Sequence, residues 1–120
     1  MASKRFIVEI GTGVDLHGED PTKAACRAVR DAISRNCLCG IVEIMGVEDF
    51  NAVEVEVVVA VPRAQNVDLD KVMAELPVGR KRAQVVEGGM MVKGICVPKF
   101  GVDCDQILVA NAAITVFVEK

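Results

Sequence analysis

The sequence predicts an α+β fold, a two-layer sandwich in which one mostly antiparallel sheet carries two helices on one face. Two observations lead to this fold class. Five segments have the apolar or alternating pattern of strands and two have helical periodicity, in the order β-α-β-β-α-β-β. No internal repeat, linker or low-complexity segment divides the 120 residues, so we expect a single α+β domain over 1–120.

The first strand is predicted over 5–10, where β-branched and aromatic residues dominate. A helix then begins at Pro21, because Asp20 is a good N-cap and proline fits the first helical position. Its charged residues Lys23 and Arg27 lie away from its apolar stripe. They form either a solvated face or, together with the helix N-terminus, a surface for an anionic ligand. The stripe consists of Ala25, Ala28, Val29, Ala32 and Ile33.

Two further strands are predicted over 40–45 and 52–61, joined by a turn-rich loop that permits a hairpin. The second alternates valine with glutamate over its first half, so one of its faces is expected to pack on helices. Pro62 ends this strand. A short helix follows, with Asp68 as its N-cap and an apolar stripe that ends at Leu76.

The last two strands, over 90–97 and 107–118, indicate that the protein assembles. The final strand is apolar on both faces apart from Asn111 and Thr115, so it needs cover on both sides, and two helices cover only one. The apolar fraction of 52% is also high for so small a domain. We therefore expect a homo-oligomer, a trimer or larger ring, that closes the other face of the sheet.

The composition excludes several classes of function. A net charge of −3 gives no basic footprint, so nucleic acid is not an expected partner. No apolar run is long enough to cross a bilayer, and the basic start leads into a short strand, so we expect a cytoplasmic protein without a membrane partner. The five cysteines are an odd number and are expected to be reduced and mostly buried.

The candidate site is the motif segment 11–18, Gly-Thr-Gly-Val-Asp-Leu-His-Gly, which contains the only histidine and is expected to begin where the first strand ends. Asp15 and His17 stand two apart, so in an extended chain their side chains leave the backbone on the same side. In one interpretation Asp15 caps a turn; in the other the pair binds a divalent metal or acts as an acid and base. The glycines permit positive φ or close approach of a cofactor, at Gly11, Gly13 and Gly18.

Three cations are candidates for holding an anionic substrate. Arg80 and Arg82 belong to the one basic cluster, for which a solvated loop edge is the alternative interpretation. Lys93 lies inside an otherwise apolar strand, which makes it the more suggestive residue and a candidate catalytic group.

The complete string Gly-x-Gly-x-Asp-x-His-Gly resembles the hallmark of a family of small, uncharacterised conserved proteins from bacteria and plants, and the likeness covers nearly the whole chain. The strand and Gly-x-Gly-x-Asp-x-His are also similar to the start of the 2-C-methyl-D-erythritol 2,4-cyclodiphosphate synthases, which are trimeric α/β enzymes. That resemblance implies zinc binding by Asp15 and His17. Those enzymes take a third ligand from a second histidine, which is absent here, so Glu19, Asp20, a cysteine or another subunit would complete the site.

Two functions remain open at this point. The first is a small-molecule enzyme or metal-binding catalyst that acts on an anionic substrate, with zinc or manganese held by Asp15, His17 and Glu19. The second is a non-catalytic ligand-binding or scaffolding oligomer in which the glycine-rich segment is structural.

Overall fold

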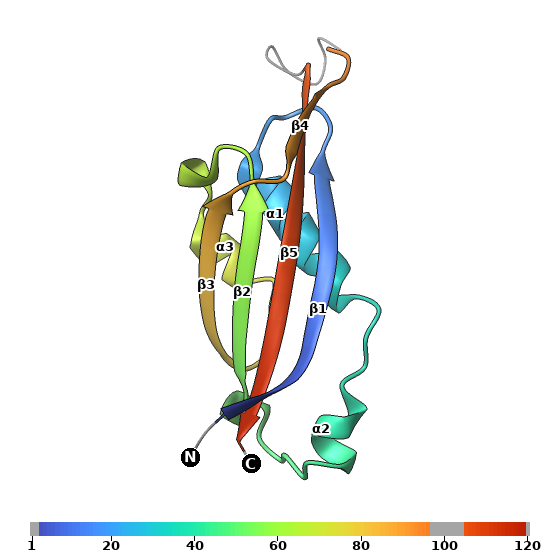
Figure 1. Cartoon of the computed structure of the whole chain (residues 1–120), viewed down its shortest axis with the longest axis vertical. Coiled ribbons are helices and arrows are strands. Elements are labelled where there is room, and N and C mark those ends of the chain that lie inside the picture. The colour runs from blue at the N-terminus through green and yellow to red at the C-terminus, as the bar shows by residue number, and fades with distance from the viewer. Residues whose placement is uncertain (1–2, 97–104, 120) are drawn as a thin grey trace.

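The computed structural model describes residues 3–96 and 105–119, and its centre is one five-stranded sheet. The strands lie in the order β1-β5-β2-β3, and β4 pairs with the part of β5 that β2 does not reach (Figure 1). β5 is antiparallel to β1, β2 and β4, whereas β2 and β3 are parallel, so the mostly antiparallel sheet is confirmed. The strands are β1 (Ser3–Asp15), β2 (Glu54–Val61), β3 (Arg80–Glu87), β4 (Met90–Lys93) and β5 (Gln106–Glu119).

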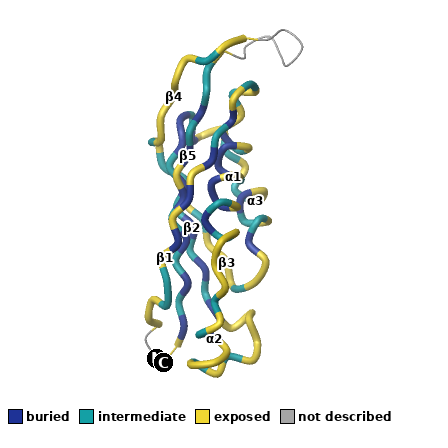
Figure 2. Tube along the Cα trace, turned by 90° about the vertical axis from the view of Figure 1, so that its right-hand side faces the viewer, coloured by how far each residue is buried: buried dark blue, intermediate teal, exposed yellow. Residues whose placement is uncertain are grey.

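Two helices cover one face of the sheet, as predicted: α1 (Pro21–Ile33) and the short α3 (Leu69–Met73). Figure 2 views the sheet from its edge and shows both helices on the same side of the strands. Asp20 caps α1, because its side chain accepts the backbone N–H groups of Thr22 and Lys23. The buried stripe of α1 packs on the inward valines of β2 and on the inward residues of β5, and together they form the core.

β1 is longer than the strand predicted over 5–10, because it continues through Asp15. Its pairing with β5 is unbroken from Ile7 opposite Val116 to Asp15 opposite Leu108. The first five residues of the motif segment are therefore part of the sheet, and the motif does not begin where the strand ends. The side of β1 that faces α1 carries small and acidic residues rather than the strand's apolar ones: Glu9, Gly11, Gly13 and Asp15.

The strand predicted over 40–45, and with it the hairpin, is wrong, because this segment forms the short helix α2 (Cys39–Glu43). Ile41 is buried and Met45 packs against the core, whereas Val42 and Ile44 are exposed. A short apolar run of this kind cannot be assigned to helix or strand from its pattern alone. The additional strand is β3, which begins in the basic segment 80–82 and pairs in parallel with β2.

The other face of the sheet, which we call the outer face, carries no helix in the described part of the chain (Figure 2). Ile10 is 61% exposed there and lies in register with Ala113 of β5, which in turn lies opposite Val58 of β2. Val8 and Met90 are also exposed. An apolar surface at the centre of a sheet is typical of an interface, and its cover by another subunit stays a prediction.

Three of the described cysteines are free, as expected, but they are not mostly buried. Cys37 and Cys39 are exposed, and Cys26 is partly buried. Cys96 takes part in a disulfide, and Cys104 lies outside the described residues. None of the helices in the described ranges is long and apolar enough to span a membrane.

Candidate functional site

The two glycines inside β1 allow the strand to approach α1 closely. A Cβ atom at Gly11 would lie 2.4 Å from the carbonyl oxygen of Ala28, and one at Gly13 would lie 2.2 Å from the nitrogen of the same residue. Real Cβ atoms do not occupy such positions, and the atoms they would meet belong to the helix backbone. Backbone atoms of α1 therefore occupy the space that a side chain at either glycine would need. Neither glycine has a positive φ, so close approach and not backbone conformation explains both.

Asp15 connects the end of β1 to the start of α1. Its residue is 4% exposed, and Oδ2 accepts the backbone N–H of Asp20 at 2.9 Å. Oδ1 lies 3.8 Å from Nη1 of Arg27, and the same Nη1 donates to the carbonyl of Val14 at 2.7 Å. A Cβ at Gly18 would lie 2.9 Å from Oδ2 of Asp15, so this glycine leaves room for the carboxylate. The predicted capping role of Asp15 thus has a defined geometry.

The motif is also held to α1 along the open edge of β1. The backbone N–H of Thr12 donates to Oδ2 of Asp31 at 2.9 Å, and Asp31 pairs with Arg35 at 2.8 Å. The hydrogen bond from Thr12 is the largest cause that lowers the pKa of the Asp31 carboxyl, and Arg35 adds to it. An unpaired strand edge is thereby partly covered by an acidic side chain.

Two strained residues lie next to the motif and pair with each other. Glu19 has φ 49° and Arg63 has φ 60°, and these are the only non-glycine residues with positive φ in the described ranges. Oε1 of Glu19 is 3.0 Å from Nη2 of Arg63. The backbone N–H of Arg63 in turn donates to Glu87. Left-handed backbone at such residues costs free energy and is concentrated at binding and catalytic sites.

A cavity of about 540 Å³, which we call the motif cavity, opens at this end of β1. Asp15 and His17 both line it, so the structure brings the two predicted residues to one site. Two cations of α1, Lys23 and Arg27, line the same cavity. The remaining lining residues are Val14, Leu16 and Gly18. The arrangement places an imidazole, a buried carboxylate and two cations beside the N-terminal turn of α1, where anions are stabilised.

Arg80 and Arg82 are not brought to the motif cavity. They lie in β3 and pair with Glu54 and Glu56 of the neighbouring strand, at 3.2 Å from Arg80 to Glu54 and 2.9 Å from Arg82 to Glu56. In sheet register Glu56 lies opposite Thr115, whereas Asp15 lies opposite Leu108 seven residues away. At 3.3 Å per residue the two regions are about 23 Å apart along the sheet.

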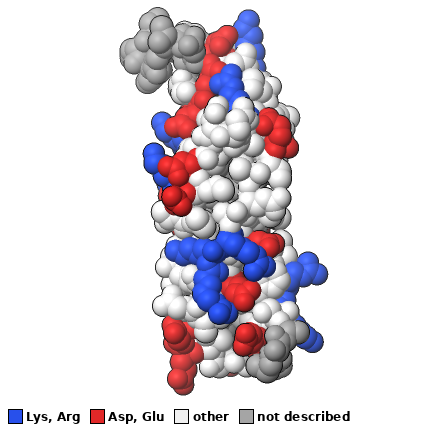
Figure 3. Space-filling model, turned by 90° about the vertical axis from the view of Figure 1, so that its left-hand side faces the viewer, with Lys and Arg blue, Asp and Glu red and all other residues white. Residues whose placement is uncertain are grey.

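Figure 3 looks onto the side of the molecule where β3 lies and shows Lys and Arg side chains gathered around acidic ones near its middle. The basic cluster therefore faces carboxylates of its own sheet, and Arg82 additionally stacks over the ring of Phe117 at 5.4 Å.

Lys93 lies in β4 at the same end of the sheet as Asp15. Its partner in register is Gln106, and Met91 two residues earlier lies opposite Leu108, the residue that also faces Asp15. Lys93 is thus at the same end of the sheet as Asp15. Because β5 lies between their two strands, these strands are about 10 Å apart. It does not line the motif cavity.

The described donor atoms do not assemble a three-ligand metal site. No group of three or more His, Cys, Asp or Glu side chains in the described ranges is placed to hold a metal ion. Glu19, the third predicted ligand, pairs with Arg63, and Asp15 is engaged by Asp20 and Arg27. The predicted zinc or manganese site stays a prediction.

Sequence reasoning missed Arg63 altogether. It follows Pro62 in a segment without a motif, and only the fold brings it to Glu19. Lys23 and Arg27 were identifiable from their spacing of four on α1, which places them on one face of the helix. The spacing alone does not show that this face of the helix lies over the end of β1.

Comparison with known proteins gives a family and a fold. A family model described as "Conserved hypothetical protein (Lin0512_fam)" matches residues 5–116. No curated protein matches the chain. The crystal structure of a FtsZ-like protein of unknown function from Nostoc punctiforme is similar, with 47% sequence identity and a TM-score of 0.90 over 100% of this chain and 99% of that one.

Proposed function

This chain belongs to the conserved hypothetical protein family Lin0512_fam, and we propose that it binds a small anionic molecule in the motif cavity, where His17 acts as an acid and base. The observation that carries the proposal is the convergence of Lys23, Arg27, Asp15 and His17 on one cavity. Phosphate and carboxylate groups are the anions that such cation pairs and a helix N-terminus bind.

The four side chains have different parts in this proposal. Lys23 forms no ion pair within the described ranges, so its ammonium is available to a ligand. Arg27 is held by the carbonyl of Val14 and by Asp15, which fixes its guanidinium at the cavity. Asp15 itself is a positioning residue, because its two oxygens already face Asp20 and Arg27.

His17 is the group with the chemistry for proton transfer, since imidazole is the side chain that changes charge near neutral pH. With a phosphate or carboxylate ester bound next to it, His17 would accept a proton from an attacking water or hydroxyl as the new bond to phosphorus or carbon forms. It would then donate this proton to the leaving oxygen as the ester bond breaks. Only this step would make the protein an enzyme; binding by the cations alone would not.

The first test replaces the free cation. Lys23→Gln is expected to weaken binding of inorganic phosphate and pyrophosphate about tenfold, as measured by isothermal titration calorimetry, because one charge-assisted contact is lost. Lys81→Gln, which removes an exposed cation from β3, is the matched control and should leave affinity unchanged. Equal affinities for all three proteins would contradict an anion site at the motif cavity.

A second measurement addresses the metal that was predicted from the motif. Elemental mass spectrometry on protein purified without chelator, alongside His17→Ala, reports whether zinc or manganese is bound in stoichiometric amount. Metal lost in the variant would favour a metal-dependent catalyst over the proposal made here. Phosphate binding that is retained without metal and weakened by Lys23→Gln would favour the anion site.

A second candidate function, self-association, is favoured by the outer face. The exposed Ile10 lies at one end of an apolar row whose centre is Ala113 and whose third member is Val58. The next row along the sheet contains the paired charges of Arg82 and Glu56. A second copy of the chain would cover the apolar row and could exchange these ion pairs across the contact. The predicted trimer or larger ring is the assembly that we propose for it.

Ile10→Lys tests this assembly by placing a charge in the apolar row. Light scattering after size exclusion is expected to give the mass of an oligomer for the native chain and that of a single chain for the variant. Ile44→Lys is the matched control, because Ile44 is 80% exposed, forms the C-cap of α2 and lies outside the sheet. A native chain that already runs as a monomer at high concentration would refute the proposed assembly.

A further inference from the structure

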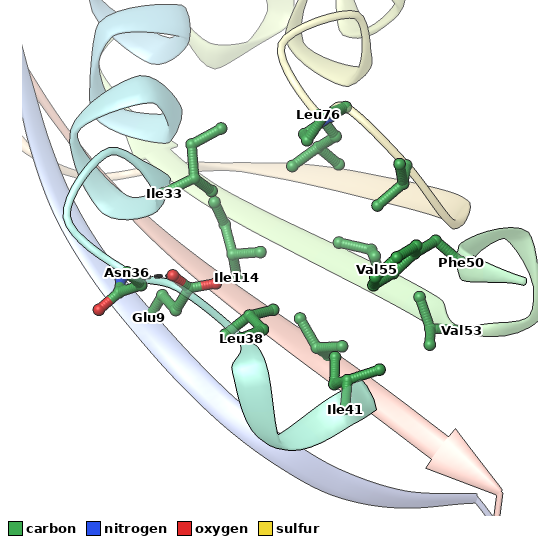
Figure 4. A pocket seen from close by; sticks show the side chains of 13 residues that line it. Glu9, Ile33, Asn36, Leu38, Ile41, Phe50, Val53, Val55, Leu76 and Ile114 are labelled. Atoms are coloured by element: carbon green, nitrogen blue, oxygen red, sulfur yellow. Dashed lines mark hydrogen bonds between the residues drawn. The ribbon is translucent and has the colours of Figure 1, made fainter. Parts of the chain in front are cut away.

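A second cavity lies between the sheet and α2, and it has a different character from the motif cavity. Its volume is about 230 Å³, and its wall is formed by apolar side chains of both helix and sheet, among them Ile33, Leu38, Ile41 and Ile114. Figure 4 shows these side chains surrounding the space, with Phe50 at one end and Glu9 with Asn36 at the other. We call it the Glu9 pocket.

Among the described residues, Glu9 is the only ionisable one that lines this pocket. It is 6% exposed and lies on the inward side of β1, opposite Ile114 of β5. It takes part in no ion pair with any other residue of the described ranges. A buried carboxylate without a cation is costly, and burial raises the pKa of Glu9 above the usual carboxyl range.

Within the described part of the chain, Asn36 is the polar side chain that contacts Glu9, and its amide has no N–H group left for a ligand. Nδ2 of Asn36 donates one N–H to Oε2 of Glu9 and the other to the carbonyl oxygen of Ala32. An amide nitrogen has two N–H groups, so both are used. The remaining carboxylate oxygen, Oε1, makes no hydrogen bond with another described residue. The polar end of the pocket therefore offers an acceptor and negative charge, but no donor.

We propose that the Glu9 pocket binds a small primary amine with an apolar body, whose ammonium group pairs with Oε1 of Glu9. The apolar part of such a molecule would lie against Ile41 and Phe50, away from the carboxylate. An ammonium supplies both the missing hydrogen-bond donor and the missing positive charge, which a neutral alcohol supplies only in part. A carboxylate or phosphate is excluded, because it would face Glu9 without a cation.

The size of the pocket limits the ligand. Sites for drug-sized molecules usually enclose 300–1,000 Å³, so a cavity of about 230 Å³ fits a molecule of roughly ten non-hydrogen atoms. Glu9 and Asp15 are six residues apart on the same strand, which is about 20 Å. The Glu9 pocket is thus separate from the motif cavity and would bind a ligand of opposite charge.

The burial of Glu9 should make the free energy of unfolding depend on pH. Because the folded-state pKa is raised, the folded chain holds a proton more tightly than the unfolded chain, and stability is lost as pH rises from the usual carboxyl range through the raised pKa. Glu9→Gln is expected to remove this loss, so that the variant is more stable than the native chain at neutral pH and not in acid. Chemical denaturation at several pH values measures it, and Glu43→Gln on exposed α2 should follow the native curve.

The binding test uses three probes of one shape: 2-phenylethylamine, 2-phenylethanol and 3-phenylpropionate. In ¹H–¹⁵N spectra of the full chain, the amine is expected to shift amide signals around Glu9, Ile41 and Phe50. It should bind about tenfold more tightly than the alcohol, and the carboxylate should not bind. Glu9→Gln should reduce amine affinity to that of the alcohol, whereas Glu43→Gln should leave it unchanged.

A second variant tests the pocket independently of its charge. Val78 lines the pocket but is exposed and is not part of the core, so Val78→Trp can fill space in the pocket without altering the core. It is expected to abolish binding of both amine and alcohol. The proposal is overturned if the three probes bind alike, if Glu9→Gln does not lower amine affinity, or if no amine binds below about 10 mM. A shift pattern centred on the motif cavity would overturn it as well.

Discussion

Gly13→Ala is expected to prevent the protein from folding or to lower its free energy of unfolding by about 3 kcal/mol or more. The added Cβ would lie 2.2 Å from the nitrogen of Ala28 and 2.3 Å from the carbonyl oxygen of Ala24, both in the backbone of α1. Backbone atoms cannot move aside as a side chain does, so the strand and the helix would have to separate. Urea denaturation followed by circular dichroism measures the loss.

Two comparisons isolate the cause of this effect. Gly46→Ala has open space around its new Cβ and carries only the strain of φ +69°, so it should cost about 1 kcal/mol. Combining Gly13→Ala with Ala28→Gly should not restore stability, because the collision is with the backbone of Ala28 and not with its methyl group. A Gly13→Ala protein as stable as the native chain would show that β1 and α1 do not pack as described.

Asp15→Ala should lower the free energy of unfolding by about 2 kcal/mol. It removes the acceptor for the backbone N–H of Asp20 and the carboxylate that faces Arg27, while the rest of the strand is unchanged. Asp15→Asn retains an amide oxygen that can accept the N–H of Asp20, so its free energy of unfolding should fall by less. Thermal unfolding of the three proteins at neutral pH ranks them.

His17→Ala separates this structural role from a chemical one. In our proposal it leaves stability close to that of the native chain and phosphate binding measurable, but abolishes any turnover of an anionic ester. If Asp15→Ala leaves stability unchanged and removes ligand or metal instead, Asp15 is a ligand-binding residue rather than a positioning residue.

The parts of the fold that depend on local chemistry could be predicted from the sequence. The N-cap at Asp20, the proline after it and the small-residue stripe of α1 follow from contacts within one helix, and the alternation of β2 follows from one strand. The strands β1 and β5 were placed correctly along the chain for the same reason. The extension of β1 was not, because glycine is a poor strand former and Gly11 and Gly13 are stabilised there by β5 and α1.

The candidate site was predictable only in part, for a similar reason. Asp15 and His17 are close in sequence, so their meeting at one cavity needs little tertiary information. Arg80 and Arg82 were grouped with them by charge alone, and charge contains no information about which end of a sheet a residue reaches. The role of Glu9 was not predictable. It is buried because its face of β1 is the one that α1 covers, and the strand's own sequence does not show which face that is.

The pairing of β5 has a consequence for how the chain reaches its native state. This strand lies between β1 and β2 and also pairs with β4, yet it comes last of all the described elements along the chain. During synthesis the earlier strands leave the ribosome without their central neighbour, so until β5 has emerged β2 can pair only with β3, and β1 and β4 lack their native partner strand. Contacts between residues so far apart in sequence slow the search for them, and a molecular chaperone that shields β1 and β2 would raise the yield of folded protein.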